Sequence, residues 1–175
     1  GRLAIAKAVD LQGIIDGVFE GAASIVPVTG AWGTFFDEMP TLREMGGSLP
    51  DDENPYVFDP DLAKQLWADS GHSAGEEHEI IYYQYSATNT NNVVAVAAEL
   101  EKNLDITVKV NRSSSIGTFY TAIGYLKPPH QQFPSMAMYV QGPRVSPAAW
   151  AANTVGAGAA NLENRQNAKL ESIVA

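Results

Sequence analysis

Between residues 79 and 140 the sequence alternates strand-like and helix-like stretches, and this alternation limits the possible folds more than any other feature. Strand patterns occupy Glu79–Tyr85, Ile106–Asn111 and Met136–Val140. A helical pattern separates each strand from the next. Parallel strands require such crossovers, whereas antiparallel neighbours can be joined by short hairpins. The sequence therefore predicts an α/β fold, in which flanking helices cover a parallel sheet that contains these three strands.

Helical patterns also precede the first strand. One helical face is expected to carry four apolar residues, Ala4, Ile5, Ala8 and Val9. Asp10 is expected to cap a second helix and Asp59 a third, which has Pro60 at its first position and Gly71 after its end. Between the second and third helices, Ser24–Tyr56 shows no hydrophobic periodicity and is rich in proline and glycine. A loop of this length is usually functional, or it rests on another part of the protein.

The composition is that of one globular domain. The chain has 175 residues, of which 45% are hydrophobic and 18% charged, with no break in composition. Its net charge of −9 opposes binding to nucleic acid or to anionic lipid. The absence of cysteine excludes disulfides, thiolate catalysis and cysteine-based metal sites. No apolar run reaches the roughly 18 residues that a membrane-spanning helix needs.

Ligands of open parallel sheets bind beyond the carboxyl ends of the strands. Three polar segments follow the predicted strands, at residues 85–92, 111–117 and 141–147. These segments and the long loop supply five candidate ligand-binding residues: Trp32, Ser86, Asn89, Gln141 and Arg144.

Simpler structural roles compete with ligand binding at each of these places. Asn91 or Asn92 is expected to cap the helix after the first strand, and Ser113–Ser115 could cap the next one. Arg144 could pair with a surface carboxylate, and Trp32 could pack in the core rather than stack on a ligand. These alternatives remain open from the sequence.

Recognised catalytic motifs are missing from the sequence. Ser113–Ser115 lie in no G-x-S-x-G elbow, and there is no Walker loop and no G-x-G-x-x-G. The segment HSAGEEH, which contains His72 and His78, could hold a metal, but such a turn is more typical of a solvated charge cluster. We therefore expect neither catalysis nor a cofactor or metal. A small α/β hydrolase that uses these serines with His130, and a structural domain without a ligand, are the alternatives.

Four segments carry a family resemblance, in this order: RLAIAKAVDLQGIIDGVFEGAA (2–23), FDPDLAKQLWADSGHSAG (58–75), HEIIYYQYSATNTNNVVAVAAELEKNLDITVKVNRSSSIGTFYTAI (78–123) and NAKLESIVA (167–175). In this order they resemble the second lobe of the family 5 extracellular solute-binding proteins, the peptide- and nickel-type receptors of ABC importers. The resemblance covers nearly the whole chain.

The resemblance implies a receptor whose two lobes close on a small-molecule or peptide solute. Such receptors work outside the cytoplasm, in the periplasm or lipid-anchored at the cell surface, and deliver solute to an ABC permease. Residues 1–175 would then form one lobe, and the missing first lobe would be its partner; the abrupt helical start would be a lobe boundary. Because one lobe covers only one side of a ligand, we expect the isolated lobe to bind solute weakly.

The segment YVQGPRVSP departs from the family pattern, in which the strand runs into Trp-Gly-Ala-Asp-Tyr-x-x-Pro. Gln141 stands at the tryptophan position, Gly142 keeps its place and Arg144 replaces the acid. In peptide receptors of the family this acid pairs with the ammonium group of the ligand. Since arginine favours carboxylate or phosphate, the resemblance implies an anionic or neutral polar group of the ligand at Gln141, Gly142 and Arg144.

Replacing Arg144 by alanine in the full-length receptor should weaken the natural ligand by at least about tenfold. A charge-assisted hydrogen bond to a carboxylate contributes roughly 1.5–3 kcal/mol, which corresponds to that loss. Calorimetry measures the affinity, and the melting temperature of the unliganded protein should not fall. An unchanged affinity, or a preferred ligand whose ammonium lies at this position, would contradict the charge reversal.

Overall fold

The computed structural model describes residues 1–23, 50–52, 54, 57–124 and 136–138. In chain order, the described elements are α1 (Arg2–Lys7), α2 (Leu11–Val18), α4 (Pro60–Asp69), β1 (Glu77–Tyr83), α5 (Ala87–Leu104), β2 (Thr107–Ser113), α6 (Ile116–Ala122) and β3 (Met136–Met138). None of the described helices is long and apolar enough to cross a membrane. The helix expected near residues 167–175 lies outside the described residues.

The sheet is parallel, as the sequence predicts. Its strand order is β2-β1-β3, and both neighbours run parallel to β1. The predicted boundaries of β1 are wrong by two residues at each end, because Glu77 already pairs with Thr107. At the other end, Gln84 and Tyr85 leave the sheet because the chain must turn into α5. β2 likewise extends two residues beyond its predicted end, to Ser113.

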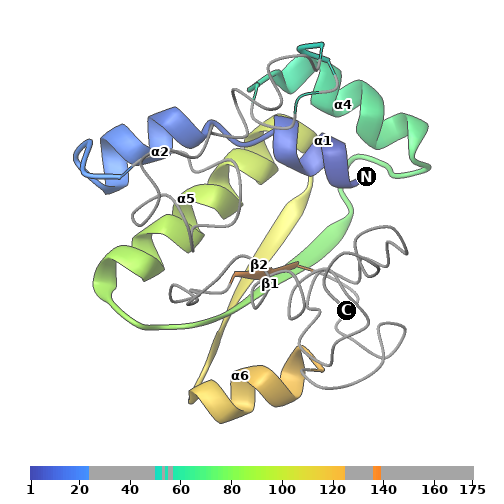
Figure 1. The fold of residues 1–175 in the computed structure, drawn as a ribbon. Helices are drawn as coiled ribbons and strands as arrows, with labels where there is room; N and C mark the ends of the chain where they lie inside the picture. The colour runs from blue at the N-terminus through green and yellow to red at the C-terminus, as the bar shows by residue number, and fades with distance from the viewer. Residues whose placement is uncertain (24–49, 53, 55–56, 125–135, 139–175) are drawn as a thin grey trace, which may run out of the picture.

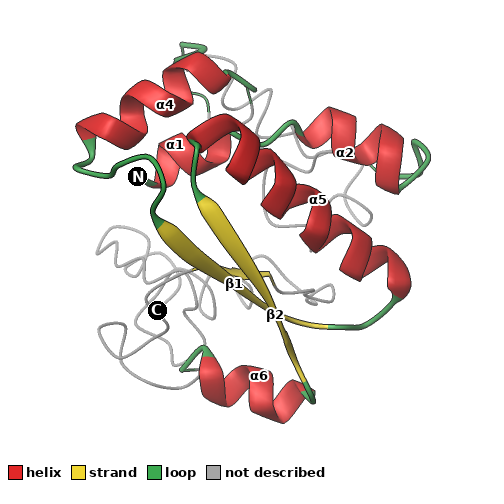
Figure 2. Cartoon of the chain, turned by 180° about the vertical axis from the view of Figure 1, so that it is seen from behind, coloured by secondary structure: helices red, strands yellow, loops and turns green. Residues whose placement is uncertain are grey.

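Helices cover both faces of the sheet, as Figures 1 and 2 show. On one face, Ile80 and Tyr82 of β1 join the main core, to which the helices α1, α4 and α5 contribute. On the other face, Ile81 packs against Phe119 of α6 and Ile123. Successive residues of β1 thus face opposite layers, which is the side-chain alternation of a strand.

The helix α5 begins earlier than the sequence predicts. The Ser86 hydroxyl accepts a hydrogen bond of 3.0 Å from the Asn89 N–H, so Ser86 is the N-cap and the prediction of Asn91 or Asn92 is wrong. Burial of Val93 and the apolar residues that follow it along the helix stabilises this long helix despite its polar first turns. The other predicted caps are confirmed, since Asp10, Asp59 and Ser115 all accept from a backbone N–H.

Lys7, at the end of α1, is fully buried although it is charged. Its ammonium donates to the carbonyl oxygens of Asp51, Asn54 (2.7 Å) and Val57 (3.3 Å). Its own carbonyl accepts from the N–H of Asp59, the N-cap of α4, at 3.0 Å. Because a buried ammonium is tolerated only with hydrogen-bond acceptors around it, Lys7 fixes Asp51, Asn54 and Val57 against α1.

The carbonyl of the next residue, Ala8, accepts a hydrogen bond from a different helix. The buried amide of Asn103 in α5 donates to the carbonyl oxygen of Ala8 at 2.8 Å, and Glu99 accepts from the same nitrogen at 2.9 Å. The junction between α1 and α2 is therefore bound both to the segment before α4 and to α5. These contacts hold the helical layer on the sheet.

Replacing Lys7 by methionine should lower the free energy of unfolding by about 2 kcal/mol or more, because three backbone carbonyls lose their donor. Urea denaturation of the chain measures this change. The control is Lys102→Met, which removes an exposed ammonium 3.8 Å from Glu99 and should change stability by less than about 0.5 kcal/mol. Equal effects of the two substitutions would show that the contacts of Lys7 do not stabilise the fold.

Candidate functional site

The strands β1 and β2 end together, and this carboxyl edge is where an open parallel sheet presents ligand-binding groups. Tyr83, the last residue of β1, is in register with Ser113, the last residue of β2. The connections to α5 and α6 therefore leave the sheet side by side. Both are short, so their side chains are positioned by the strand before them and the capped helix after them.

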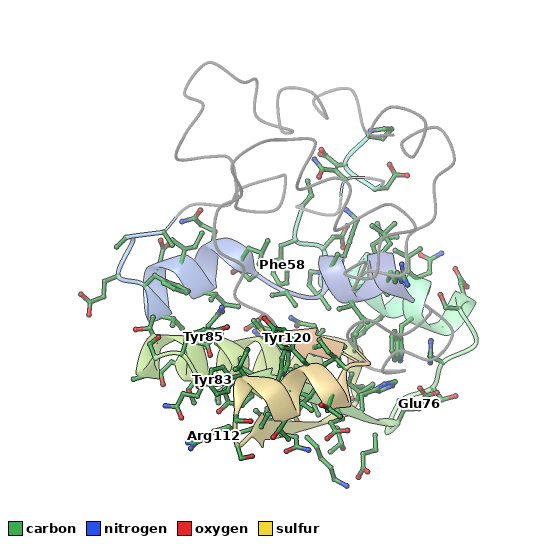
Figure 3. The ribbon with its side chains drawn as sticks, turned by 60° about the horizontal axis from the view of Figure 1, so that its bottom comes forward. Phe58, Glu76, Tyr83, Tyr85, Arg112 and Tyr120 are labelled. Atoms are coloured by element: carbon green, nitrogen blue, oxygen red, sulfur yellow. The ribbon has the colours of Figure 1, made fainter. Side chains whose placement is uncertain are left out.

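Three tyrosines gather at this edge, and we call Tyr83, Tyr85 and Tyr120 the tyrosine cluster (Figure 3). The ring centroids of Tyr83 and Tyr85 lie 5.0 Å apart, with the rings nearly perpendicular at 81°. Tyr120 follows Phe119, which is fully buried and anchors α6 on the sheet. The cluster thus joins β1, the connection to α5 and helix α6.

Tyr85 is the exposed member of the tyrosine cluster, with half of its surface accessible. Desolvation raises the pKa of its phenol above 10.0, and Tyr120 and Tyr83 raise this pKa further. The phenol is therefore neutral at physiological pH. A neutral phenol can pack its ring against a ligand while its hydroxyl donates or accepts a hydrogen bond.

Arg112 supplies a positive charge at the same end of the sheet, on the face of Tyr82 and not on the α6 face of the tyrosine cluster. It is exposed, pairs in register with Tyr82 and forms no ion pair within the part of the chain that the structure describes. The preceding polar residues of β2 are engaged differently: Lys109 binds Glu77 at 2.6 Å, and the Asn111 amide donates to Glu79 at 2.7 Å. Arg112 is thus available to an anionic group of a ligand.

Two of the predicted site residues lie at this edge. Ser86 caps α5, and the backbone N–H of Asn89 donates to it. The side-chain oxygen of Asn89 is buried and has no hydrogen-bond partner among the described residues, which is uncommon for a buried acceptor. The other four predicted residues, Trp32, Gln141, Gly142 and Arg144, lie outside the described residues.

Of the three serines at the end of β2, Ser115 caps α6. The Ser115 hydroxyl accepts from the Thr118 N–H at 3.0 Å and lies 2.9 Å from the Thr118 hydroxyl. Ser113 is buried. The described histidines, His72 and His78, bind Glu76 instead of a serine, and His130 lies outside the described residues. This geometry gives the hydrolase alternative no support.

Sequence reasoning missed Arg112 and the tyrosine cluster. A signal was present, because Tyr83 and Tyr85 are two residues apart at the end of a strand and therefore lie on one side of the chain. Tyr120 gave a weaker signal, since a tyrosine in a helix pattern is most simply a core residue. Only the packing of Phe119 against Ile81 shows that α6 brings Tyr120 to the edge.

Solved structures share this fold over 99% of the chain. The ABC transporter substrate-binding protein CtaP from Listeria monocytogenes matches with a TM-score of 0.69 at 18% identity, over 32% of its own length. The oligopeptide-binding protein AppA from Bacillus subtilis, in complex with a nonapeptide, matches with a TM-score of 0.64 at 17% identity, over 34% of its length. The chain thus has the fold of one part of a solute-binding protein and spans about a third of these proteins.

The sequence profile of the bacterial extracellular solute-binding proteins, family 5 (middle), matches residues 2–160. The chain belongs to this family, and the resemblance noted from the sequence is confirmed. None of the curated proteins compared with the chain matches it.

Replacing Ser86 by alanine should lower the free energy of unfolding by about 1 kcal/mol, because α5 loses its N-cap. Ser86→Asp retains an acceptor for the Asn89 N–H and should cost much less. Thermal or urea denaturation compares the two variants. If both destabilise the chain equally, the hydroxyl is needed for something other than the cap.

Proposed function

We propose that the chain is the second lobe of an extracytoplasmic solute-binding protein, which delivers an oligopeptide or another small polar solute to an ABC permease without catalysing a reaction. The observation that carries this proposal is the tyrosine cluster at the carboxyl edge of the sheet, in a chain that belongs to a solute-binding family. It would work outside the cytoplasm, where its solute arrives, either in the periplasm or lipid-anchored at the cell surface.

The groups at this edge suit a peptide or a similar polar solute. A peptide offers backbone donors and acceptors together with apolar side chains. The phenol rings of Tyr83 and Tyr85 supply apolar contact area that is already ordered, which lowers the entropic cost of binding. Arg112 can take a carboxylate, whereas Asn89 is included on the sequence reasoning alone, since its side-chain oxygen is buried. We include Trp32, Ser86, Gln141, Gly142 and Arg144 in the proposed site on the sequence reasoning alone.

A second lobe is needed to complete such a site. Binding sites for small molecules bury most of the ligand surface, whereas one open edge contacts only one side of it. The solved relatives are about three times as long as this chain. The structure of a Helicobacter pylori relative, DppA, contains the peptide STSA. We therefore propose that the remaining part of the full-length protein closes over the tyrosine cluster.

Tyr85→Ala in the full-length protein should weaken binding of a co-purified solute by at least about tenfold. The substitution removes the exposed aromatic surface that the solute would cover. The solute is identified by mass spectrometry after release and its affinity measured by calorimetry. The control is Val94→Ala, which truncates a similarly exposed side chain about two helical turns along α5 and should leave the affinity unchanged.

The isolated chain gives the second arm of this experiment. It should bind oligopeptides no more tightly than about 10 µM, since the opposing lobe is missing. Tight binding by the chain alone would show that the site is not shared between two lobes. An unchanged affinity of the Tyr85→Ala protein would show that the solute binds away from the tyrosine cluster.

A further inference from the structure

Three potential metal ligands converge at the end of the sheet opposite to the tyrosine cluster. Glu76 directly precedes β1, and Figure 3 shows it far from Tyr85. One carboxylate oxygen of Glu76, Oε2, lies 2.9 Å from Nδ1 of His72 and 3.2 Å from Nε2 of His78. These three atoms all lie within 4.8 Å of one another. We call His72, Glu76 and His78 the His-Glu-His cluster.

Trp67 holds both imidazole rings in place. Its indole stacks on the ring of His72, with centroids 4.0 Å apart and planes 13° apart. It meets the ring of His78 edge-on at 5.2 Å and 69°. Trp67 is itself 4% exposed and belongs to the main core. The two rings therefore rest on a rigid surface, and their orientation does not depend on Glu76 alone.

The turn between α4 and β1 orients the carboxylate. The backbone N–H of Ser73 donates to the other carboxylate oxygen, Oε1, at 2.7 Å, which directs Oε2 toward the two imidazoles. Gly71 and Gly75 flank this turn with positive φ angles of 83° and 80°, which other residues adopt only with strain. Such outer hydrogen bonds are what orients the ligands of protein metal sites.

The spacing of the cluster fits a small cation. In zinc sites the metal lies about 2.0–2.2 Å from each nitrogen or oxygen ligand, so neighbouring ligand atoms of a tetrahedron are roughly 3.3 Å apart. The two contacts of Oε2, at 2.9 and 3.2 Å, are close to that value. A cation could thus enter with small side-chain movements. Without a cation, the two imidazoles hydrogen-bond directly to Oε2, and a bound cation would replace these hydrogen bonds.

We propose that His72 Nδ1, Glu76 Oε2 and His78 Nε2 bind a first-row transition metal cation such as Zn²⁺, with water completing the coordination. Two imidazoles and a carboxylate favour zinc, nickel or copper over magnesium and calcium, which prefer oxygen ligands alone. The side chains are 22–35% exposed, so a cation has access from solvent. Since the seven residues of β1 span about 20 Å, this site is separate from the proposed solute site.

Calorimetry of the untagged 175-residue chain with ZnCl₂ tests the proposal. We expect one saturable site per chain. Glu76→Gln should weaken it at least about tenfold, because the substitution removes the anionic ligand. The glutamine side chain keeps an oxygen that can accept a hydrogen bond from the Ser73 backbone N–H, so the turn should persist. The control is Glu77→Gln, which removes an adjacent carboxylate that pairs with Lys109 and should leave zinc affinity unchanged.

Nuclear magnetic resonance of the imidazole rings gives an independent readout. Zinc should shift the ring signals of His72 and His78 in the original chain, and MgCl₂ at the same concentration should not. Zinc should also raise the melting temperature of the original chain more than that of His78→Gln. The absence of saturable zinc binding with a dissociation constant below about 100 µM would overturn the proposal. An equal zinc affinity of the Glu76→Gln chain, or zinc-induced ring shifts confined to His130, would overturn it as well.

Discussion

The buried ammonium of Lys7 connects parts of the chain that are distant in sequence. A buried charge needs hydrogen-bond acceptors, and the carbonyls of Asp51, Asn54 and Val57 supply them shortly before α4 begins. The position of α4 places Trp67 in the core, and Trp67 in turn supports His72 and His78. One hydrogen-bonded lysine therefore contributes to the geometry at the amino end of the sheet.

The two ends of the sheet carry different chemistry because the strands are parallel. Within the described residues, the carboxyl ends present the tyrosine hydroxyls and Arg112, while the amino end presents imidazoles and carboxylates. At that end, hydrogen bonds from His72 and then from the Ser73 backbone hold the pKa of the Glu76 carboxyl below its usual 4.5. An antiparallel sheet would mix these groups at both edges. The strand direction, which periodicity alone predicts, thus separates the two proposed sites.

The alternation of strand and helix patterns predicted the parallel sheet, and capping residues at the starts of helical patterns predicted most helix caps, because both signals are local in sequence. These signals failed at the start of α5, where polar residues resemble a loop and the burial of Val93 and later residues decides the outcome. They could not reveal the burial of Lys7, whose acceptors lie 44 to 50 residues away. The sequence showed HSAGEEH as a segment that could hold a metal, but not the arrangement of His72 and His78, since that requires Trp67 from another element.

The parallel register also sets the order in which the sheet can form during synthesis. Glu77 pairs with Thr107, and Ile80 with Met136, so β3 joins its neighbour over a longer stretch of chain than β2 does. Closing a longer loop costs more entropy, and distant pairing is slower. On a ribosome, β1, α5 and β2 can associate before β3 emerges. The central strand would then expose one unpaired edge until β3 pairs with it.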